Sequence, residues 1–304
     1  MTNRYAPFLF GKKKGIRESA TDQIFGFLVT LIMAVILIVS VYPFLSILSL
    51  SFSGPGSSYG TSLIPKNPTL DAYKMVLKND LIWVGYKNTI IRVVLGTVSS
   101  LLVTIPAAYA WSKKELPFRG IFTAIILFTM FFNGGLIPNY LMIRNYKMMD
   151  SMLALILPRL VDTFALIVMR NFFLGTPPSL EESAYIDGAN TYTILLRIVL
   201  PISLPIIATV TMWNAVSHWN QWFDAMLYMQ SQEKKVLQIV LRNIVLEGTQ
   251  QVISTADIGQ DRGYNNPDVV KAATVVFATF PILCVYPFVQ KYYVAGITVG
   301  SVKG

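Results

Sequence analysis

One long apolar run constrains this chain more than any other feature. Residues 25–50 contain no charged side chain. About 20 apolar residues are enough to cross the hydrocarbon core of a bilayer, and an uninterrupted run of this length is typical of a membrane helix rather than of a short buried helix in a soluble enzyme. The composition agrees, because only 13% of the residues are charged, against about 25% in an ordinary soluble domain. The sequence therefore predicts an integral membrane protein.

Further apolar runs predict an all-α architecture with several membrane spans. Helices and closed barrels are the structures that satisfy their backbone hydrogen bonds in lipid, and these runs are too long and too little alternating for barrel strands. We expect six transmembrane helices, near residues 25–50, 89–111, 121–143, 152–174, 199–229 and 269–293. The expected organisation is a cytoplasmic N-terminal segment (1–24), a first helix (25–50), an extracellular loop (51–88), a core of five helices (89–293) that includes the loop 177–201 and an extracellular loop 230–268, and a cytoplasmic tail (294–304).

The basic residues indicate the orientation of the chain. Much of the formal charge of +9 lies beside the first two apolar runs, at residues 4–17 and 113–119. Basic flanks are typical of the cytoplasmic side, so we expect both termini and the loop 177–201 in the cytoplasm. Membrane lipid explains this charge better than nucleic acid does. Since Cys284 and His218 are the only cysteine and histidine, we expect neither a disulfide framework nor a metal site in this chain.

A polar stretch between the fourth and fifth runs predicts a helical hairpin. Residues 180–201 read LEESAYIDGANTYTILLRIVLP. We expect the two prolines at 177–178 to end the preceding helix. Ser179 and Glu182 have the spacing of a capping box, which would start a short helix, and this helix should end near Gly188.

A second helix, capped by Thr191, is expected to lead through Arg197 into Pro201. The stretch from Glu182 to Pro201 matches the pattern E-A-A-x3-G-x9-I-x-L-P at every fixed position except Ser183, where the pattern has alanine. It resembles the cytoplasmic coupling loop of ABC importer permeases.

The resemblance implies that the hairpin seats in a groove of a separate ATPase subunit and transmits its motion. Acidic side chains would engage basic groups of that subunit, and small residues would permit close approach. The alternative is that Glu182 only caps a helix. The residues implicated in ATPase coupling are Glu181, Glu182, Ser183, Ala184, Asp187, Gly188, Ile198, Leu200 and Pro201.

The chain lacks the sequence G-x4-G-K-[ST], whose backbone cradles nucleotide phosphates. We therefore expect no catalytic residues and no cofactor in this chain, with ATP and Mg²⁺ bound by a partner ATPase.

The fifth run combines amide, imidazole and indole side chains. Asn214, His218 and Gln221 recur at helical spacing, which places them on one face, and Trp219 and Trp222 flank that face. Amide and imidazole groups suit the hydroxyls of a sugar, while aromatic rings pack on its C–H faces, and an apolar pocket with a few placed polar groups is typical of a ligand site. An aromatic belt at the membrane interface is the alternative.

Three further segments resemble the sugar importer permeases common in Gram-positive bacteria: residues 131–140, residues 217–220 and the tail from residue 290 to 304. The resemblance covers almost the whole chain. It implies a type I ABC importer of carbohydrates in a bacterial plasma membrane, with an oligosaccharide as the cargo. The candidate residues of the substrate path are Asn133, Asn139, Tyr140, Trp213, Asn214, His218, Trp219, Asn220 and Trp222.

Such a permease pairs with a second, homologous permease, two ATPase subunits and an extracellular solute-binding protein. The resemblance also suggests that the loop after the fifth run contacts the binding protein and that the tail reaches the ATPases.

Two other functions remain open at this point. Arg159 and Asp162, three residues apart in one apolar run, can pair with each other, and charged groups in a membrane segment often mark a transport path. They favour a stand-alone secondary transporter or channel. An intramembrane enzyme built around His218 would need paired catalytic groups, which the sequence does not offer.

Overall fold

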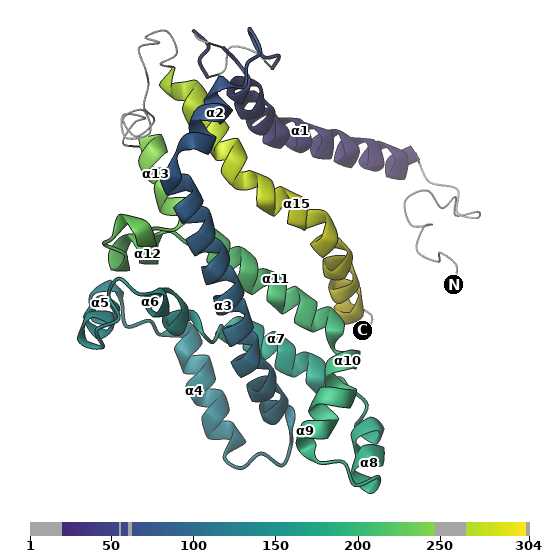
Figure 1. Cartoon of the computed structure of the whole chain (residues 1–304). Coiled ribbons are helices and arrows are strands. Elements are labelled where there is room, and N and C mark those ends of the chain that lie inside the picture. Colours follow the sequence, from purple (N-terminus) through teal and green to yellow (C-terminus); the bar gives the residue numbers. More distant parts are fainter. Residues whose placement is uncertain (1–19, 55, 60–62, 247–265, 302–304) are drawn as a thin grey trace.

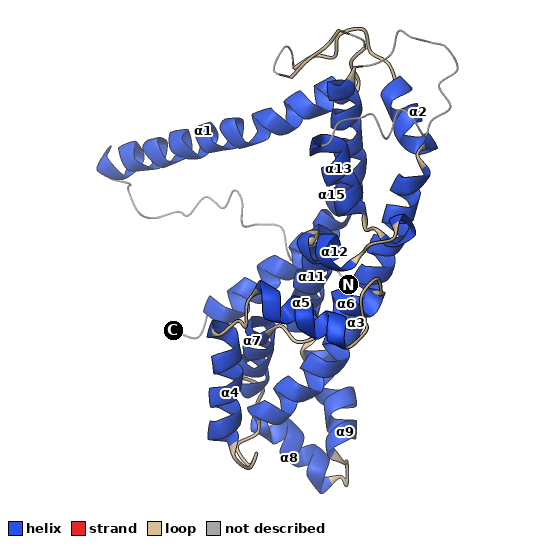
Figure 2. Cartoon of the chain, turned by 90° about the vertical axis from the view of Figure 1, so that its left-hand side faces the viewer, coloured by secondary structure: helices blue, strands red, loops and turns tan. Residues whose placement is uncertain are grey.

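The computed structural model describes residues 20–54, 56–59, 63–246 and 266–301, and within these ranges the chain forms helices and loops without a β-strand (Figures 1 and 2). The helices are α1 (Ala20–Ser51), α2 (Asp71–Lys78), α3 (Asp80–Ser112), α4 (Arg119–Phe131), α5 (Leu136–Asn145), α6 (Met152–Ile156), η1 (Leu157–Arg159), α7 (Thr163–Leu174), α8 (Pro178–Ile186), α9 (Thr191–Ile194), η2 (Leu195–Val199), α10 (Leu200–Ile202), α11 (Leu204–Asn220), α12 (Phe223–Tyr228), η3 (Gln232–Lys234), α13 (Leu237–Leu246) and α15 (Pro267–Ser301). The all-α prediction is confirmed.

Three of the expected membrane helices are broken rather than continuous. α1, α3 and the first part of α15 are each long and apolar enough to cross a membrane. The other three candidates are bent pairs: α4 with α5 at 109°, residues 152–159 with α7 at 47°, and residues 191–202 with α11 at 83°. If each pair is one span, the described chain has up to six spans.

The breaks occur where the sequence cannot continue a helix. Gly134 and Gly135 separate α4 from α5, and Gly135 has a φ of +90°, a backbone conformation that favours glycine. Pro158 lies in the single turn of η1, and Pro205 lies in the first turn of α11. Proline lacks an N–H and clashes with the preceding turn, so each position ends one helix and permits another at a new angle.

Several predicted boundaries are wrong. α3 begins at Asp80 rather than near residue 89, because the side chain of Asn79 caps it by accepting from the N–H of Leu81 at 2.9 Å. The fifth segment stops being one helix at Asn220, after which Gln221 is extended and α12 follows. α15 continues to Ser301, past the predicted end at residue 293.

α3 packs against three other helices, α7, α11 and α13 (Figure 1). Small residues let the helices approach closely. A Cβ added to Gly96 would lie 2.4 Å from Nε2 of His218 on α11, and one added to Gly85 would lie 2.9 Å from Cα of Leu237 on α13. α3 is therefore fitted to its neighbours at glycine positions.

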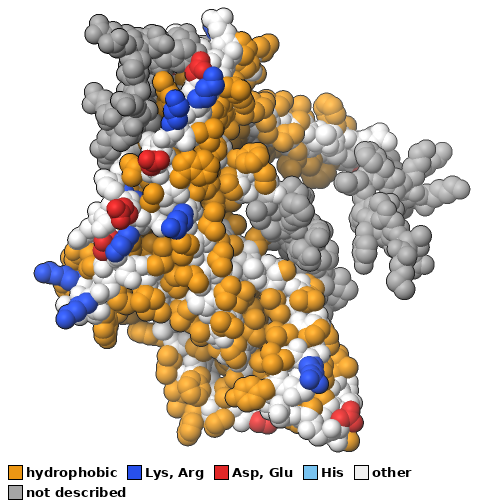
Figure 3. All heavy atoms as spheres, in the orientation of Figure 1, with side chains coloured by type: hydrophobic (Ala, Val, Ile, Leu, Met, Phe, Trp, Pro, Cys, Tyr) orange, Lys and Arg blue, Asp and Glu red, His pale blue; other side chains and the backbone are white. Residues whose placement is uncertain are grey.

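α1, in contrast to α3, is mostly exposed. It extends away from the rest of the bundle (Figures 1 and 2), and every described side chain from Thr21 to Leu45 is exposed. Hydrophobic side chains also dominate the face that is visible along α3 and α4, with charged groups mostly at its edges (Figure 3). Surfaces of this kind need lipid or another apolar protein surface around them.

Replacing Gly96 by alanine tests the close approach of α3 and α11. The added methyl group would meet the buried imidazole of His218, so we expect the free energy of unfolding to fall by about 1–3 kcal/mol. The melting temperature of the purified protein in detergent measures this. The matched control is Gly26→Ala on α1, where a Cβ would meet nothing within 4 Å; an equal effect of both substitutions would contradict the steric explanation.

Candidate functional site

The predicted hairpin is present and protrudes from one end of the bundle (Figures 1 and 2). α8 ends at Ile186, and Gly188 follows with a φ of +81°. The N–H of Gly188 donates to the carbonyl of Tyr185 at 3.0 Å, and that of Ala189 to the carbonyl of Ala184 at 2.9 Å. These bonds satisfy the last carbonyls of α8 and form a tight turn that is typical of a glycine after a helix.

The predicted caps of the hairpin are wrong. α8 begins at Pro178, so the two prolines start this helix rather than end α7, which stops at Leu174. Proline suits the first helical position because the N–H that it lacks would have no partner there. Ser179 consequently lies inside the first turn, and no side chain caps α8, so the capping box with Glu182 does not form. Asn190 rather than Thr191 caps α9, by accepting from the N–H of Thr193 at 2.8 Å.

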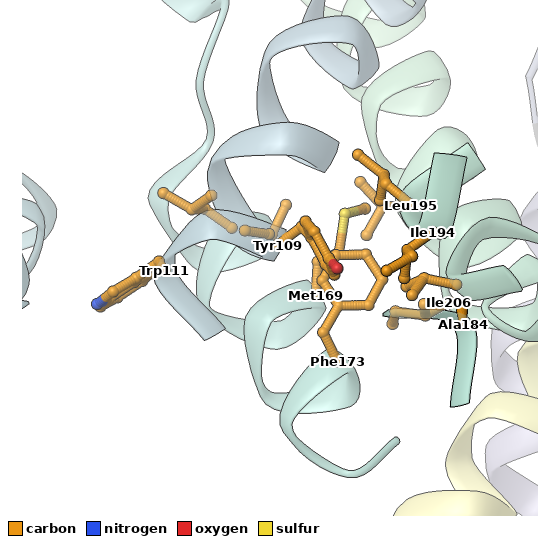
Figure 4. Close-up of a cluster of buried hydrophobic side chains, with 13 residues drawn as sticks. Tyr109, Trp111, Met169, Phe173, Ala184, Ile194, Leu195 and Ile206 are labelled. Carbon is orange, nitrogen blue, oxygen red and sulfur yellow. The ribbon is translucent and has the colours of Figure 1, made fainter. Parts of the chain in front are cut away.

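A hydrophobic cluster fastens the hairpin to the bundle (Figure 4). Ala184 on α8 is 7% exposed and belongs to the same cluster as Met169 and Phe173 on α7. Ile194 and Tyr109 complete the contact from α9 and α3. The alanine of the motif therefore points into the chain's own core.

An ion pair adds a polar link between the hairpin and α3. Glu181 pairs with Nζ of Lys113 and accepts from the hydroxyl of Tyr109 at 3.1 Å. The Glu181 side chain is only 16% exposed, and it is engaged by these two residues of the chain itself. The exposed acidic groups of the hairpin are Glu182 and Asp187.

The rest of the hairpin's outer surface is partly apolar. Ile186 is 86% exposed and Tyr192 is 77% exposed, although both are large hydrophobic residues. Sequence reasoning missed them; the signal is an isoleucine and a tyrosine placed beside the polar turn. Among the other implicated residues, Ser183, Gly188 and Pro201 are exposed, while Ile198 and Leu200 are half-buried against the hydrophobic cluster.

The second feature is a polar cavity of about 980 Å³. It lies where α4 breaks into α5, where η1 breaks from α7, and beside the end of α11. Broken membrane helices commonly surround ligand sites, because only a polar or buried environment tolerates their free backbone groups. Five of the predicted path residues line it: Asn133, Asn139, Trp213, Asn214 and His218.

The other predicted path residues lie elsewhere. Tyr140 stacks against Tyr228, which lines the cavity, with ring centroids 6.4 Å apart. Trp219, Asn220 and Trp222 line a second hollow of about 530 Å³ beside α13 and α15. These three diverge from the cavity because α11 ends at Asn220 and because the helix turns successive side chains by about 100°. Gln221 follows the last residue of α11, so it is not on the predicted helical face, but it still lines the cavity.

The predicted pair of Arg159 and Asp162 does not form. The chain breaks between η1 and α7, so the two residues do not share one continuous helix. Asp162 instead caps α7 by accepting from the N–H of Ala165 at 2.7 Å. Nη1 of Arg159 donates to the hydroxyl of Ser217 at 3.1 Å, and its Nε lies 3.8 Å from Asp224.

Sequence reasoning missed the strongest polar contact beside the cavity. Arg92 on α3 is fully buried; its Nη1 donates to Oδ1 of Asp224 at 3.1 Å and to the carbonyl of Gln221 at 3.0 Å, and its Nη2 donates to Oδ2 of Asp224. A bidentate pair of this kind is strong and directional. An arginine inside an apolar run was the available signal.

Two buried polar groups of α11 have no hydrogen-bond partner within the described part of the chain: Nδ2 of Asn214 and Nδ1 of His218. Both residues line the cavity. Buried polar atoms are normally paired; these two atoms are covered by the surrounding side chains, so a ligand in the cavity would reach them only after a local rearrangement of the wall.

Asp150 fixes the turn before α6 to the loop after α12. It accepts from the N–H groups of Gln230 and Ser231, each at 3.1 Å, and lies 3.3 Å from Nζ of Lys234. The Ser231 hydroxyl, followed by these other donors, lowers the pKa of Asp150 from 3.8 to about 2. Its stabilising contribution is thus complete above pH 3.8 and is lost as the pH falls towards 2, so the link persists at neutral pH.

Broken membrane helices around a cavity with polar lining residues are typical of membrane transport proteins. No protein-family model matches the chain. It is 36% identical over 286 residues to the polygalacturonan/rhamnogalacturonan transport system permease protein YtcP of Bacillus subtilis, covering 93% of this chain and 99% of that protein. It is also 37% identical over 268 residues to the protein LplC of B. subtilis, covering 88% and 90% of the two chains.

The fold matches a chain in the crystal structure of a bacterial ABC transporter that imports the acidic polysaccharide alginate, with a TM-score of 0.85, 34% identity and coverage of 92% and 100%. This chain belongs to the family of permease subunits of ABC sugar importers. It is a transport subunit and not an enzyme, since ATP hydrolysis belongs to separate subunits in such importers. The secondary-transporter alternative is not favoured.

Gly188 is needed for its backbone conformation rather than for the space around it, and substitutions there can test this. A Cβ would meet nothing within 4 Å, but the φ of +81° is unfavourable for residues other than glycine. We expect Gly188→Val to destabilise the hairpin turn by at least about 1–2 kcal/mol and to lower transport, because left-handed backbone is costly. Gly188→Asn should retain more activity, since asparagine tolerates this conformation. ATP-driven uptake and melting temperature compare the two, and equal retention of function by both variants would contradict this role.

The pair of Lys113 and Glu181 can be tested by exchanging its charges. Glu181→Lys places two cations together, so we expect a lower melting temperature and weaker ATP-driven uptake. The double variant, with Lys113→Glu added, restores an opposite-charge pair and should recover both measurements in part. A double variant no better than the single one would show that the pair does not link the hairpin to α3.

Proposed function

We propose that the chain forms one half of the translocation path of an oligosaccharide importer and couples it to ATP hydrolysis through α8 and α9. The observation that carries the proposal is the combination of a polar cavity at the helix breaks with an anchored hairpin whose tip is exposed. Under this proposal both termini and the hairpin face the cytoplasm, in agreement with the basic flanks.

The cavity has the chemical features that suit a carbohydrate. Asn133, Asn139 and Gln221 offer amide groups, while Trp213 and Phe164, with ring centroids 5.5 Å apart, offer aromatic faces. Hydrogen-bonding groups placed among aromatic and apolar walls are typical of small-molecule sites. The name of the YtcP relative refers to polysaccharides, and a more distant relative at 27% identity is named for arabinooligosaccharides, which supports an oligosaccharide as the cargo.

The hairpin suits a docking element that transmits force. Its inner side is fixed by the cluster around Ala184 and by the ion pair of Glu181, while Ile186, Tyr192 and Glu182 project outward. Buried hydrophobic anchors dominate interface energies. We therefore assign Ile186 as the anchor in a groove of an ATPase subunit, which binds ATP and Mg²⁺, with Glu182 and Asp187 at the rim.

Three further partners belong to the proposal. A homologous permease would complete the path and cover apolar surface such as that of α1. A second copy of the ATPase would engage the hairpin of that permease. A solute-binding protein would deliver the sugar at the end opposite the hairpin, where α2 lies (Figure 1). Residues 247–265 of the expected contact loop are outside the described residues.

The proposal as a whole is tested by reconstitution of the complex in vesicles. ATP supplied on the hairpin side should drive oligosaccharide uptake that requires the binding protein. Sugar uptake driven by a proton or sodium gradient without ATP would overturn the proposal.

The anchor is tested by truncating Ile186 to alanine. We expect the ATPase subunit to co-purify at least about 10-fold more weakly, because removing a central apolar anchor costs about 2 kcal/mol or more. Tyr146→Ala is the matched control, since Tyr146 is 72% exposed at the far end of α5. Equal retention of the ATPase by both variants would remove Ile186 from the interface.

A further inference from the structure

The charges around the cavity are not equivalent. Within the described residues its wall holds one cation, Arg159, and two carboxylates, Asp162 and Asp224. Counting these charged side chains suggests an acidic wall, but the contacts that each side chain makes change that conclusion.

Both carboxylates are already engaged. Asp224 accepts hydrogen bonds from both terminal nitrogens of the buried Arg92 and from the N–H of Ala225 at 2.7 Å. Asp162 caps α7, where its charge faces the positive end of the helix dipole. The charge of Asp224 is thus matched by Arg92, whereas Asp162 keeps its negative charge, which the start of α7 stabilises.

Arg159 is engaged much less. Its side chain is 40% exposed, its hydrogen bond goes to the neutral hydroxyl of Ser217, and its 3.8 Å approach to Asp224 reaches a carboxylate that Arg92 already occupies. Nη2 of Arg159 has no hydrogen bond in the described part of the chain. One guanidinium edge with its positive charge therefore remains available at the wall.

The neighbours of Arg159 reinforce this arrangement. Ser217 lies on α11 between Asn214 and His218, whose side chains are 7% and 3% exposed and carry the unpartnered Nδ2 and Nδ1 atoms. All four residues line the same cavity, where the two unpartnered atoms are covered and the guanidinium of Arg159 is exposed. A ligand that places a carboxylate against Arg159 would satisfy its free guanidinium edge.

We propose that Arg159 is a specificity-determining residue that binds the carboxylate of a uronic acid in the cargo. The names of the YtcP relative and of the alginate importer already refer to acidic polysaccharides, and the inference adds the residue of this chain that would recognise their charge. The inference deepens and rests on the proposed function. A guanidinium is suited to this task because its planar fork matches a carboxylate and stays charged. Arg92 has the supporting role of neutralising Asp224, which would otherwise pair with Arg159 and repel an acidic ligand.

The test uses the complete importer in vesicles, with its binding protein saturated by either of two cargoes. One cargo is a galacturonic acid trimer; the other is the same trimer after chemical reduction of its carboxyl groups to alcohols, so that length and linkage are matched. We expect Arg159→Gln to lower uptake of the acidic trimer by about 10-fold or more, as expected for loss of a charged hydrogen bond. Uptake of the reduced trimer should change little.

Two further variants separate recognition from structure. Arg159→Lys should recover part of the acidic uptake, because it keeps the charge but loses the fork. Arg144→Gln should transport both trimers as the unmodified chain does, since Arg144 is exposed and does not line the cavity. Equal loss of both trimers in Arg159→Gln, or transport of only the reduced trimer by the unmodified importer, would overturn the inference while leaving the proposed function intact. Absence of ATP-driven uptake of both trimers and of any neutral oligosaccharide would overturn the proposed function and this inference with it.

Discussion

Backbone hydrogen bonding in lipid is the constraint on which the rest of this structure depends. A continuous helix satisfies its own N–H and carbonyl groups, but each break frees several of them, and hydrocarbon offers no partner. The breaks at Gly134–Gly135 and after Arg159 open onto the same cavity, and side-chain caps from Asn133 and Asp162 satisfy part of the freed backbone. Broken spans and a polar cavity are therefore one feature: the breaks need a polar surrounding, and that surrounding is a place where a polar solute can bind.

α3 contributes a buried positive charge beside the cavity. Removing a guanidinium from water costs several kcal/mol unless it is paired and hydrogen-bonded. The two terminal nitrogens of Arg92 meet this requirement with the carboxylate of Asp224 and the carbonyl of Gln221, while its Nε has no hydrogen-bond partner within the described residues. These contacts hold the end of α11 and the start of α12 against α3. The same contact explains why α11 ends where it does, since the extended Gln221 presents its carbonyl to the arginine.

Much of the outline could be predicted from the sequence, because apolar run length and the motif from Glu182 to Pro201 depend on local chemistry. The membrane character, the all-α class and the hairpin follow from such signals. The pairing of charges could not be predicted in this way: Arg159 and Asp162 are three residues apart, yet the helix breaks between them, whereas Arg92 and Asp224 are 132 positions apart and meet. The rule that residues three or four apart are neighbours holds only within a continuous helix. Glycine pairs and prolines predict where a helix breaks, but they do not predict which partners the side chains beside the break will find.

Under the proposed function, α3 is the element that joins the two sites. Near one end Tyr109 and Lys113 contact Glu181 of the hairpin; further along the same helix Gly96 fits against His218, and Arg92 holds Asp224 at the cavity. Closely packed helices resist compression, so a displacement of α8 must be taken up either by movement of α3 or by bending within it. Pro106 lies between the two groups of contacts and removes one backbone hydrogen bond there. The stiffness of α3 at this proline therefore decides how much of a movement at the hairpin reaches the cavity wall.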